Sequence, residues 1–221
     1  MIYRGLIYDF YDSNKSTIVI KGYTNADGYD LLIPEKIDGL PVVKIDDAAF
    51  SGCKELNSVS LPDCLQFIGE NAFRACCNLE KVEFYKSFNP AAILEIEKKA
   101  FHYCEKLLIF AYSGAVAVGE RAFDECRKLD SFTSYIVYAS KNAFCKCKNL
   151  CSLHFGHNAH WESNSFTECK RLQNLYFYHP LSRCMLSNQY QMRFLHNKNI
   201  FCCEDFNYID CAYEGENVVI I

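Results

Sequence analysis

The chain has 221 residues, half of them hydrophobic, and carries 23 Lys and Arg against 27 Asp and Glu, for a formal net charge of -4. No basic run stands out, which argues against nucleic acid as the main partner because phosphate binding needs clustered Lys and Arg side chains. No run of 18 apolar residues is present that would predict a membrane span. The first residues, MIYRGLIYDFYDSNKS, lack the apolar core of a signal peptide, so the chain as it stands is expected to be cytoplasmic.

The first predicted element is a β-hairpin near the N-terminus. The stretch LIYDFYDSNKSTIVIKGY contains two segments in which apolar and polar residues alternate, separated by a polar turn at residues 12–16. Alternation with a period of two is typical of a strand with one buried face, and two such strands around a short turn predict a hairpin. We therefore expect residues 1–44 to form an N-terminal cap that contains this hairpin.

A repeated pattern occupies the middle of the chain. Six copies of [AS]-F-x-x-C-x-x-L-x-x-[VFL] begin at residues 49, 72, 100, 122, 143 and 165. An apolar residue also lies five positions before the phenylalanine of each copy, at Ile45, Ile68, Ile96, Val118, Ala139 and Trp161. Matches at Phe, Cys and Leu in every copy are far beyond chance, so we assign residues 45–178 to six repeats.

The physics of one repeat follows from its spacing. Phe, Cys and Leu recur every three residues, which a 3₁₀ or other tight helical turn places on one face. The apolar residues that follow the Leu alternate with polar ones, as in LEKVEF from Leu79, and this indicates a strand with one buried face. A turn and a strand cannot bury their apolar face alone, whereas stacked copies can, and the result is a solenoid. Phe123, Leu129 and their counterparts are expected to be buried.

These motifs resemble a known family. The L-x-x-L-x-L core is similar to that of leucine-rich repeats, and IGENAFRACCNLEKVEF resembles the BspA-like type found in bacterial and protozoan surface proteins. The resemblance covers roughly residues 17–178 and includes the entry stretch YTNADGYDLLIPEKIDGLPVVKIDDAAF. It implies an α/β repeat fold, mainly β: a right-handed solenoid with parallel strands, capped at both ends. Members of the family are often secreted or cell-surface proteins.

Three irregularities interrupt or follow the array. The stretch YKSFNPAAILEI lengthens one repeat and predicts a loop near Pro90, and the fourth repeat has Ser134 where an apolar residue belongs. After residue 178 the pattern stops. Residues 182–197 predict a helix, and the segments 200–206 and 217–221 predict strands, so residues 179–221 are interpreted as a C-terminal cap.

The fourteen cysteines and one histidine-rich stretch raise the question of metal binding. Six cysteines hold the same position in the six repeats, where they form a column of small apolar side chains and do not face one another as a disulfide requires. We expect a fully reduced chain. In CSLHFGHNAHWE (residues 151–162) a cysteine and three histidines recur every three residues, a composition that suits zinc. The repeat explains the same spacing, with His154 pointing outward from a strand and His157 and His160 in the following loop, so we expect no metal and no cofactor.

No catalytic motif is apparent. The sequence contains no G-x-S-x-G, H-E-x-x-H, P-loop or dinucleotide-binding glycine pattern. Cys151 near His154 has the composition of a nucleophile and its base, but nothing indicates a third group that would orient them. The chain is therefore expected not to be an enzyme.

The outward positions of the predicted strands provide the candidate binding face. These positions are mostly small and polar, with three tyrosines in one column that also holds Gly156, and with Tyr176 beside Tyr178. Tyrosine is enriched at interfaces. Tyrosine also suits strands in general, so this signal has a second explanation. The candidate contact residues are Lys81, Glu83, Tyr85, Tyr135, His154, Tyr176 and Tyr178.

Two functions of different classes follow. The first is a non-enzymatic binding module that recognises a protein or a glycan through the sheet face. The alternative is a structural scaffold that associates with its own copies through the solenoid ends, because open sheet ends pair readily unless they are capped. We expect a monomer, with end-to-end association as the alternative.

Overall fold

The computed structural model describes residues 1–24, 30–86, 93–178, 198–202 and 217–220. Within these ranges the chain forms strands and turns, and none of the described segments is helical. Accordingly, no helix capable of crossing a membrane is found in this part of the chain. The mainly-β prediction is confirmed, whereas the helical component of the predicted α/β repeat is missing from the described residues.

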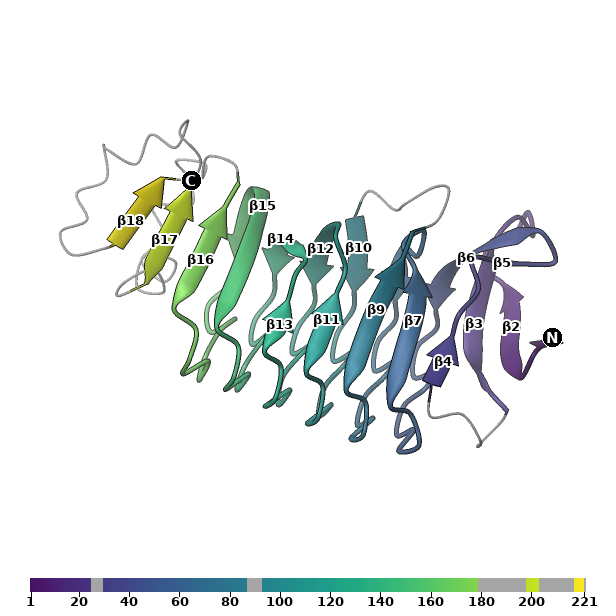
Figure 1. The fold of residues 1–221 in the computed structure, drawn as a ribbon. Coiled ribbons are helices and arrows are strands. Elements are labelled where there is room, and N and C mark those ends of the chain that lie inside the picture. The colour runs from purple at the N-terminus through teal and green to yellow at the C-terminus, as the bar shows by residue number, and fades with distance from the viewer. Residues whose placement is uncertain (25–29, 87–92, 179–197, 203–216, 221) are drawn as a thin grey trace.

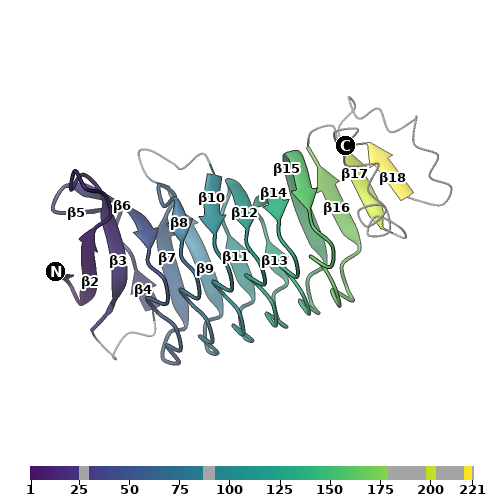
Figure 2. The same cartoon turned by 180° about the vertical axis from the view of Figure 1, so that it is seen from behind.

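The strands form two layers that run along an elongated coil (Figures 1 and 2). The short sheet has five strands: β4 (Asp30–Leu32), β7 (Ser58–Pro62), β9 (Lys81–Tyr85), β11 (Ile109–Ala111) and β13 (Ser131–Phe132). The long sheet contains β1 (Ile2–Tyr3), β2 (Leu6–Phe10), β3 (Ile18–Tyr23), β6 (Leu40–Ile45), β8 (Phe67–Ile68), β10 (Ile93–Ile96), β12 (Ala115–Val118), β14 (Tyr135–Ala139), β15 (Ser152–Trp161), β16 (Asn174–Phe177), β17 (Asn199–Cys202) and β18 (Asn217–Ile220), with β5 (Lys36–Ile37) paired to β6.

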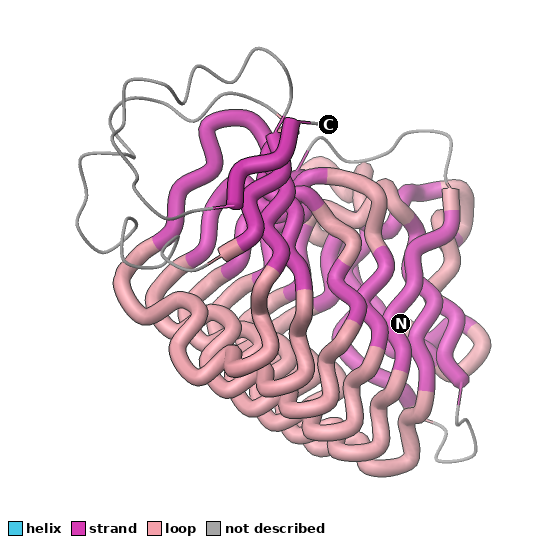
Figure 3. The backbone as a smooth tube through the Cα atoms, turned by 60° about the vertical axis from the view of Figure 1, so that its left-hand side comes forward, coloured by secondary structure: helices cyan, strands magenta, loops and turns pink. Residues whose placement is uncertain are grey.

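From β7 to β14, the coils of the chain visit both layers. The chain leaves β7 after Pro62, enters β8 at Phe67, passes through the turn that carries Phe73 and Cys76, and returns to the short sheet in β9. The turns lie side by side along one edge of the coil (Figure 3). Neighbouring described strands are parallel, except in the antiparallel pairs β1–β2, β2–β3 and β5–β6. The predicted solenoid with parallel strands is therefore present.

The turns that carry Phe and Cys contain the i to i+3 hydrogen bonds of the predicted 3₁₀ turn, but no helix continues through them. The amide of Cys76 donates to the carbonyl of Phe73 at 3.2 Å, the i to i+3 bond of a 3₁₀ turn. The residues two positions before and two positions after each repeat phenylalanine have a positive φ, as at Lys99 (φ 55°) and Tyr103 (φ 62°). A left-handed residue cannot continue a right-handed helix. The turn amides instead bond across coils, as from Phe73 N to the carbonyl of Ala100 at 2.8 Å.

The repeat phenylalanines form one continuous column in the core. The rings of Phe50, Phe73, Phe101, Phe123 and Phe144 stack with centroids 5.1 or 5.2 Å apart, and Phe166 follows at 5.7 Å. All six are buried, as is Leu129, so the predicted core is confirmed. Ring stacking and removal of apolar surface from water both stabilise this column.

The repeat cysteines form a second column beside the rings. The thiols of Cys76, Cys104, Cys126, Cys147 and Cys169 each donate to the carbonyl of the phenylalanine one coil earlier, at 3.0 to 3.1 Å. A thiol is small enough for this position and is a weak donor, which accounts for its recurrence. Every cysteine in the described ranges is a free thiol, as the column arrangement predicted.

The two layers converge toward the C-terminal half of the coil. Residues 63–66 separate β7 from β8, residues 112–114 separate β11 from β12, and only residues 133–134 separate β13 from β14. In the next coil β15 is one unbroken strand, so His157 and His160 lie in a strand and not in the predicted loop. Ser134, the predicted irregularity, is fully buried at this junction.

Strands continue the array at both ends. The predicted hairpin is present, because β2 pairs with β3 antiparallel, and β3 then pairs with β6. Beyond the sixth repeat, β17 and β18 extend the parallel ladder from β16, at the two places where strands were predicted. The helix predicted for residues 182–197 and the loop predicted near Pro90 lie outside the described residues. The domain limits at 44/45 and 178/179 stay predictions.

Candidate functional site

The candidate site is the outward face of the short sheet and of the strands β15 to β17 that continue it in the front layer of Figure 1. Side chains alternate along each strand, so the buried Val82, Leu153 and Leu175 leave their neighbours facing out. The ladder aligns Ser60 with Glu83 and Glu83 with Ala111, and it aligns His154 with Tyr176. These pairings agree with the predicted columns of outward residues.

Five aromatic side chains meet on the C-terminal half of this face: Tyr135, His154, Tyr176, Tyr178 and Phe201, which we call the aromatic stripe. Their rings are in direct contact along the sheet. His154 stacks on Tyr176 with centroids 4.7 Å apart, and Tyr176 stacks on Phe201 at 4.5 Å. The ring of Tyr135 meets that of Tyr178 edge-on at 5.2 Å. Tyr135 is 36% exposed and Tyr178 39% exposed, so the stripe presents apolar ring surface to solvent.

Partial burial favours the neutral forms of the titratable groups in the stripe. Nδ1 of His154 lies 3.1 Å from the hydroxyl of Tyr178. Burial lowers the pKa of His154, which favours the uncharged imidazole at neutral pH. Burial raises the pKa of Tyr178, and the nearby Tyr135 and Tyr176 raise it by smaller amounts. A ligand that binds here therefore meets neutral aromatic rings.

Neutral polar groups border the stripe on one side. Ser152, Asn174 and Asn199 occupy aligned outward positions on β15, β16 and β17. The side-chain amide of Asn199 donates to the side-chain oxygen of Asn174 at 2.8 Å. These groups supply hydrogen-bonding partners beside the apolar rings without adding a formal charge.

The position of Tyr135 differs from the predicted register. The repeat pattern aligned Tyr135 with Gly156, whereas the structure pairs it with His154. Tyr135 and Ile136 pair with His154 and Phe155, and the ladder shifts after Ile136, so that Tyr138 pairs with His160. Gly156 adapts to this shift, since a Cβ on it would lie 3.0 Å from Cγ1 of Val137. The pairing of Tyr135 with His154 also brings its ring to Tyr178.

The other three predicted residues form a separate group on β9, so the single predicted contact face is divided in two. Lys81 and Glu83 form an ion pair with Nζ to Oε1 at 2.7 Å, and both side chains are about half-exposed. The hydroxyl of Tyr85 donates to the carbonyl of Ile33 at 2.7 Å. Burial raises the pKa of Tyr85 to about 12, so this hydroxyl stays protonated. The ring of Tyr85 is thus held toward the N-terminal side of β9, away from the stripe.

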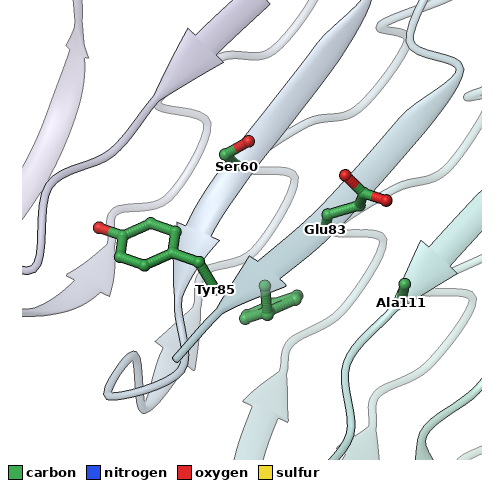
Figure 4. A pocket seen from close by; sticks show the side chains of 5 residues that line it. Ser60, Glu83, Tyr85 and Ala111 are labelled. Carbon is green, nitrogen blue, oxygen red and sulfur yellow. The ribbon is translucent and has the colours of Figure 1, made fainter. Parts of the chain in front are cut away.

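A hollow of about 280 Å³ lies beside Glu83 and is lined by Ser60, Glu83, Phe84, Tyr85 and Ala111; we call it the Glu83 hollow. Figure 4 shows Glu83 rising between the short side chains of Ser60 and Ala111, with the ring of Tyr85 on the same strand. Because its neighbours on β7 and β11 are small, Glu83 is flanked by open space.

Phe201 was not among the predicted contact residues. It lies beyond the last repeat, so the six-copy pattern assigns it no column. The strand predicted near residue 200 could have indicated it, because pairing that strand with the last repeat places Phe201 next to Tyr176.

The histidine-rich strand does not gather metal ligands. His160 pairs with Tyr138 in the ladder and stacks on its ring at 5.9 Å, whereas His154 belongs to the stripe. The thiol of Cys151 donates to the carbonyl of Asn149 at 3.1 Å. Among the described residues, no group of three or more His, Cys, Asp or Glu side chains is placed to hold a metal ion.

A buried polar cluster lies at the turn edge, away from the sheet face. His102 and Asp124 are 5% and 1% exposed, and Nε2 of His102 lies 3.3 Å from Oδ2 of Asp124. Arg121 donates to the same carboxylate oxygen at 2.7 Å. Burial lowers the pKa of His102, the nearby Asp124 opposes this effect, and Arg121, Arg74 and Lys99 add to it.

Comparison with solved structures shows the same fold in bacterial proteins. The chain is similar to the Treponema pallidum leucine-rich repeat protein, with 24% identity, a TM-score of 0.56, and coverage of 78% of this chain and 90% of that chain. It is also similar to a leucine-rich cell surface protein of Faecalibacterium prausnitzii, with 23% identity, a TM-score of 0.52, and coverage of 80% of this chain and 54% of that chain. A Bacteroides ovatus leucine-rich repeat protein matches with 19% identity, a TM-score of 0.53, and coverage of 93% and 60%.

The chain spans little more than half the length of the second and third of these structures. No curated protein matches the chain. The family model described as the BspA type leucine-rich repeat region matches in six copies, over residues 35–134 and 94–211. This match covers more than half of the sequence and coincides with the stacked coils of the fold, so the chain belongs to the BspA-type leucine-rich repeat family.

Proposed function

We propose that this protein is a binding module that recognises a protein partner through its outward sheet face, with the aromatic stripe as the main contact. The repeat family supports a protein-binding scaffold. The observation that carries the choice of surface is the set of five touching aromatic rings across β14 to β17. Aromatic residues are enriched in binding hot spots because each ring contributes a large apolar contact area with few rotatable bonds.

The geometry favours binding over catalysis. The stripe is an outward sheet surface whose rings contact one another, and its histidine is bonded to a tyrosine hydroxyl. Leucine-rich repeat proteins are generally non-enzymatic, and an interface needs apolar anchors surrounded by satisfied polar groups. The Asn174–Asn199 pair and Ser152 fit the role of such a polar rim.

Site-specific photo-crosslinking tests this proposal. A photoreactive phenylalanine analogue at position 178 should capture a protein from an extract of the source organism. The same analogue at position 138 is the matched control, because Tyr138 lines a different hollow with Glu95 and Ala117 of the long sheet. Capture at 138 but not at 178 would contradict the assignment. Capture of a glycan at 178 would identify the alternative ligand class and reject a protein partner.

A further inference from the structure

The Glu83 hollow has the chemistry to bind a cation. It combines the carboxylate of Glu83 with the aromatic ring of Tyr85, and both line the same 280 Å³ space. A planar guanidinium forms hydrogen bonds with a carboxylate and stacks on an aromatic face, which a compact ammonium does less well. The volume of the hollow is near the lower end of the range of ligand pockets, about 300 Å³, and accommodates a single long side chain.

The walls of the hollow are held in place before any ligand binds. The hydrogen bond from Tyr85 to the carbonyl of Ile33 fixes the ring, and Phe84 packs against Tyr112 with centroids 4.6 Å apart. Rigid walls favour binding because little side-chain freedom is lost when the ligand arrives. Ser60 and Ala111 leave the space open because their side chains are short.

Lys81 acts as an internal competitor for the carboxylate. Its Nζ lies 2.7 Å from Oε1 of Glu83. An exposed ion pair of this kind is weak, so an arriving guanidinium can bind the second oxygen or displace Lys81. Asp30 adds a second negative charge on the same face, where it accepts a hydrogen bond from the hydroxyl of Ser58 at 2.6 Å.

We propose that the Glu83 hollow binds one arginine side chain of the same protein partner that contacts the aromatic stripe. This inference rests on the proposed function for the identity of the partner. Glu83 and His154 lie on strands about three strand spacings apart, or roughly 15 Å. An extended segment of the partner crosses that distance in about four to five residues at about 3.3 Å per residue. The recognised segment therefore carries an arginine and an apolar or aromatic residue with that separation.

Amide NMR of the full chain tests the hollow by itself, with N-acetyl-arginine amide as the probe and the neutral isostere N-acetyl-citrulline amide as the control. The arginine probe should shift the amides of Glu83 and Ala111 in a saturable way, and the citrulline probe should not. Glu83→Gln should weaken arginine binding at least about fivefold, because the charge is lost while the shape is kept. Lys81→Met should strengthen it by a few fold, because the competitor is removed.

Two further variants keep the outcomes distinguishable. Ser60→Phe fills the hollow and should abolish the arginine shifts without changing any charge. Tyr178→Ala should leave the arginine titration unchanged. Equal binding of both probes, an unaffected Glu83→Gln variant, or shifts centred on Tyr176 would overturn the arginine site. If the arginine site fails while the crosslink at position 178 succeeds, the proposed function stands without it.

Discussion

The two halves of the sheet face differ although the same repeat builds both. In the N-terminal half, the layers are separated by connecting residues, and the face carries the Lys81–Glu83 ion pair beside a hollow. In the C-terminal half, the layers merge in β15, and the face carries touching aromatic rings. The buried columns of Phe and Cys run through both halves. The difference shows that connection length, which the core does not specify, determines which outward side chains meet.

The largest expected effect comes from breaking what the two halves share. Phe123 contacts Phe101, Phe110, Phe132 and Phe144 in the middle of the column. Phe123→Ala should lower the free energy of unfolding by about 3–5 kcal/mol, because it removes buried area and leaves a cavity. Chemical denaturation measures this loss. Thr133→Ala, an exposed position in the same repeat, is the control, and a loss below about 0.5 kcal/mol for Phe123→Ala would contradict the assigned core.

The second prediction concerns the aromatic half alone. Tyr135→Ala and Tyr178→Ala should each weaken partner binding by more than about 1 kcal/mol, with little change in stability. Because the two rings touch, the losses of binding free energy in the two tyrosine variants should not add in the double variant. The losses caused by Tyr135→Ala and Glu83→Gln, which lie in separate groups, should add. Calorimetric titration with the partner protein that the photo-crosslinking experiment identifies measures these values. Normal binding by both tyrosine variants together with loss of binding in Tyr138→Ala would move the contact to the opposite layer.

The third prediction concerns the turns, which are alike in both halves. Lys99 holds a positive φ that costs an L-residue with a Cβ about 1 kcal/mol, and glycine adopts it freely. Lys99→Gly should therefore raise the free energy of unfolding by up to about 1 kcal/mol. Lys98→Gly, one residue earlier, does not relieve a positive φ and should not stabilise the protein. Thermal unfolding compares the two, and a destabilised Lys99→Gly protein would show that the turn is not strained.

The smallest expected effect is a pH dependence of stability from the turn edge. Burial lowers the pKa of His102 in the folded protein below the ordinary value of 6.5, so the unfolded chain binds the proton more readily. The stabilising contribution is present above about pH 6.5 and is lost as the pH falls below it. The effect is modest because the nearby Asp124 carboxylate raises the pKa of His102 and so partly offsets the effect of burial. His102→Gln should flatten the fall in unfolding free energy between about pH 7 and 5.

His154 provides the control for the pH dependence, because burial lowers its pKa in the same direction. His154→Gln should remove only its own part of the slope and leave the part due to His102. If the unfolding free energy falls between about pH 7 and 5 as steeply in His102→Gln as in the original protein, the buried His102–Asp124 pair does not control stability in acid.

Much of the fold was predictable because the repeat is periodic. The recurrence of Phe, Cys and Leu predicted the buried columns, since equivalent residues of stacked copies occupy equivalent places. The alternation around each strand predicted the outward side of Glu83, Tyr85, His154 and Tyr176. The predicted 3₁₀ turn is present as separate i to i+3 bonds, but a three-residue period alone does not reveal the left-handed residues that keep it from continuing as a helix.

The sequence by itself therefore determined the solenoid, its core and the residues that face outward, because these depend on a local pattern repeated six times. Only the tertiary structure decided which outward residues are neighbours. Tyr135 contacts Tyr178 because it pairs with His154 and not with Gly156, and Phe201 joins Tyr176 because a strand beyond the last repeat continues the sheet. Both contacts depend on pairing between distant segments, and a one-residue change of register alters every such pair.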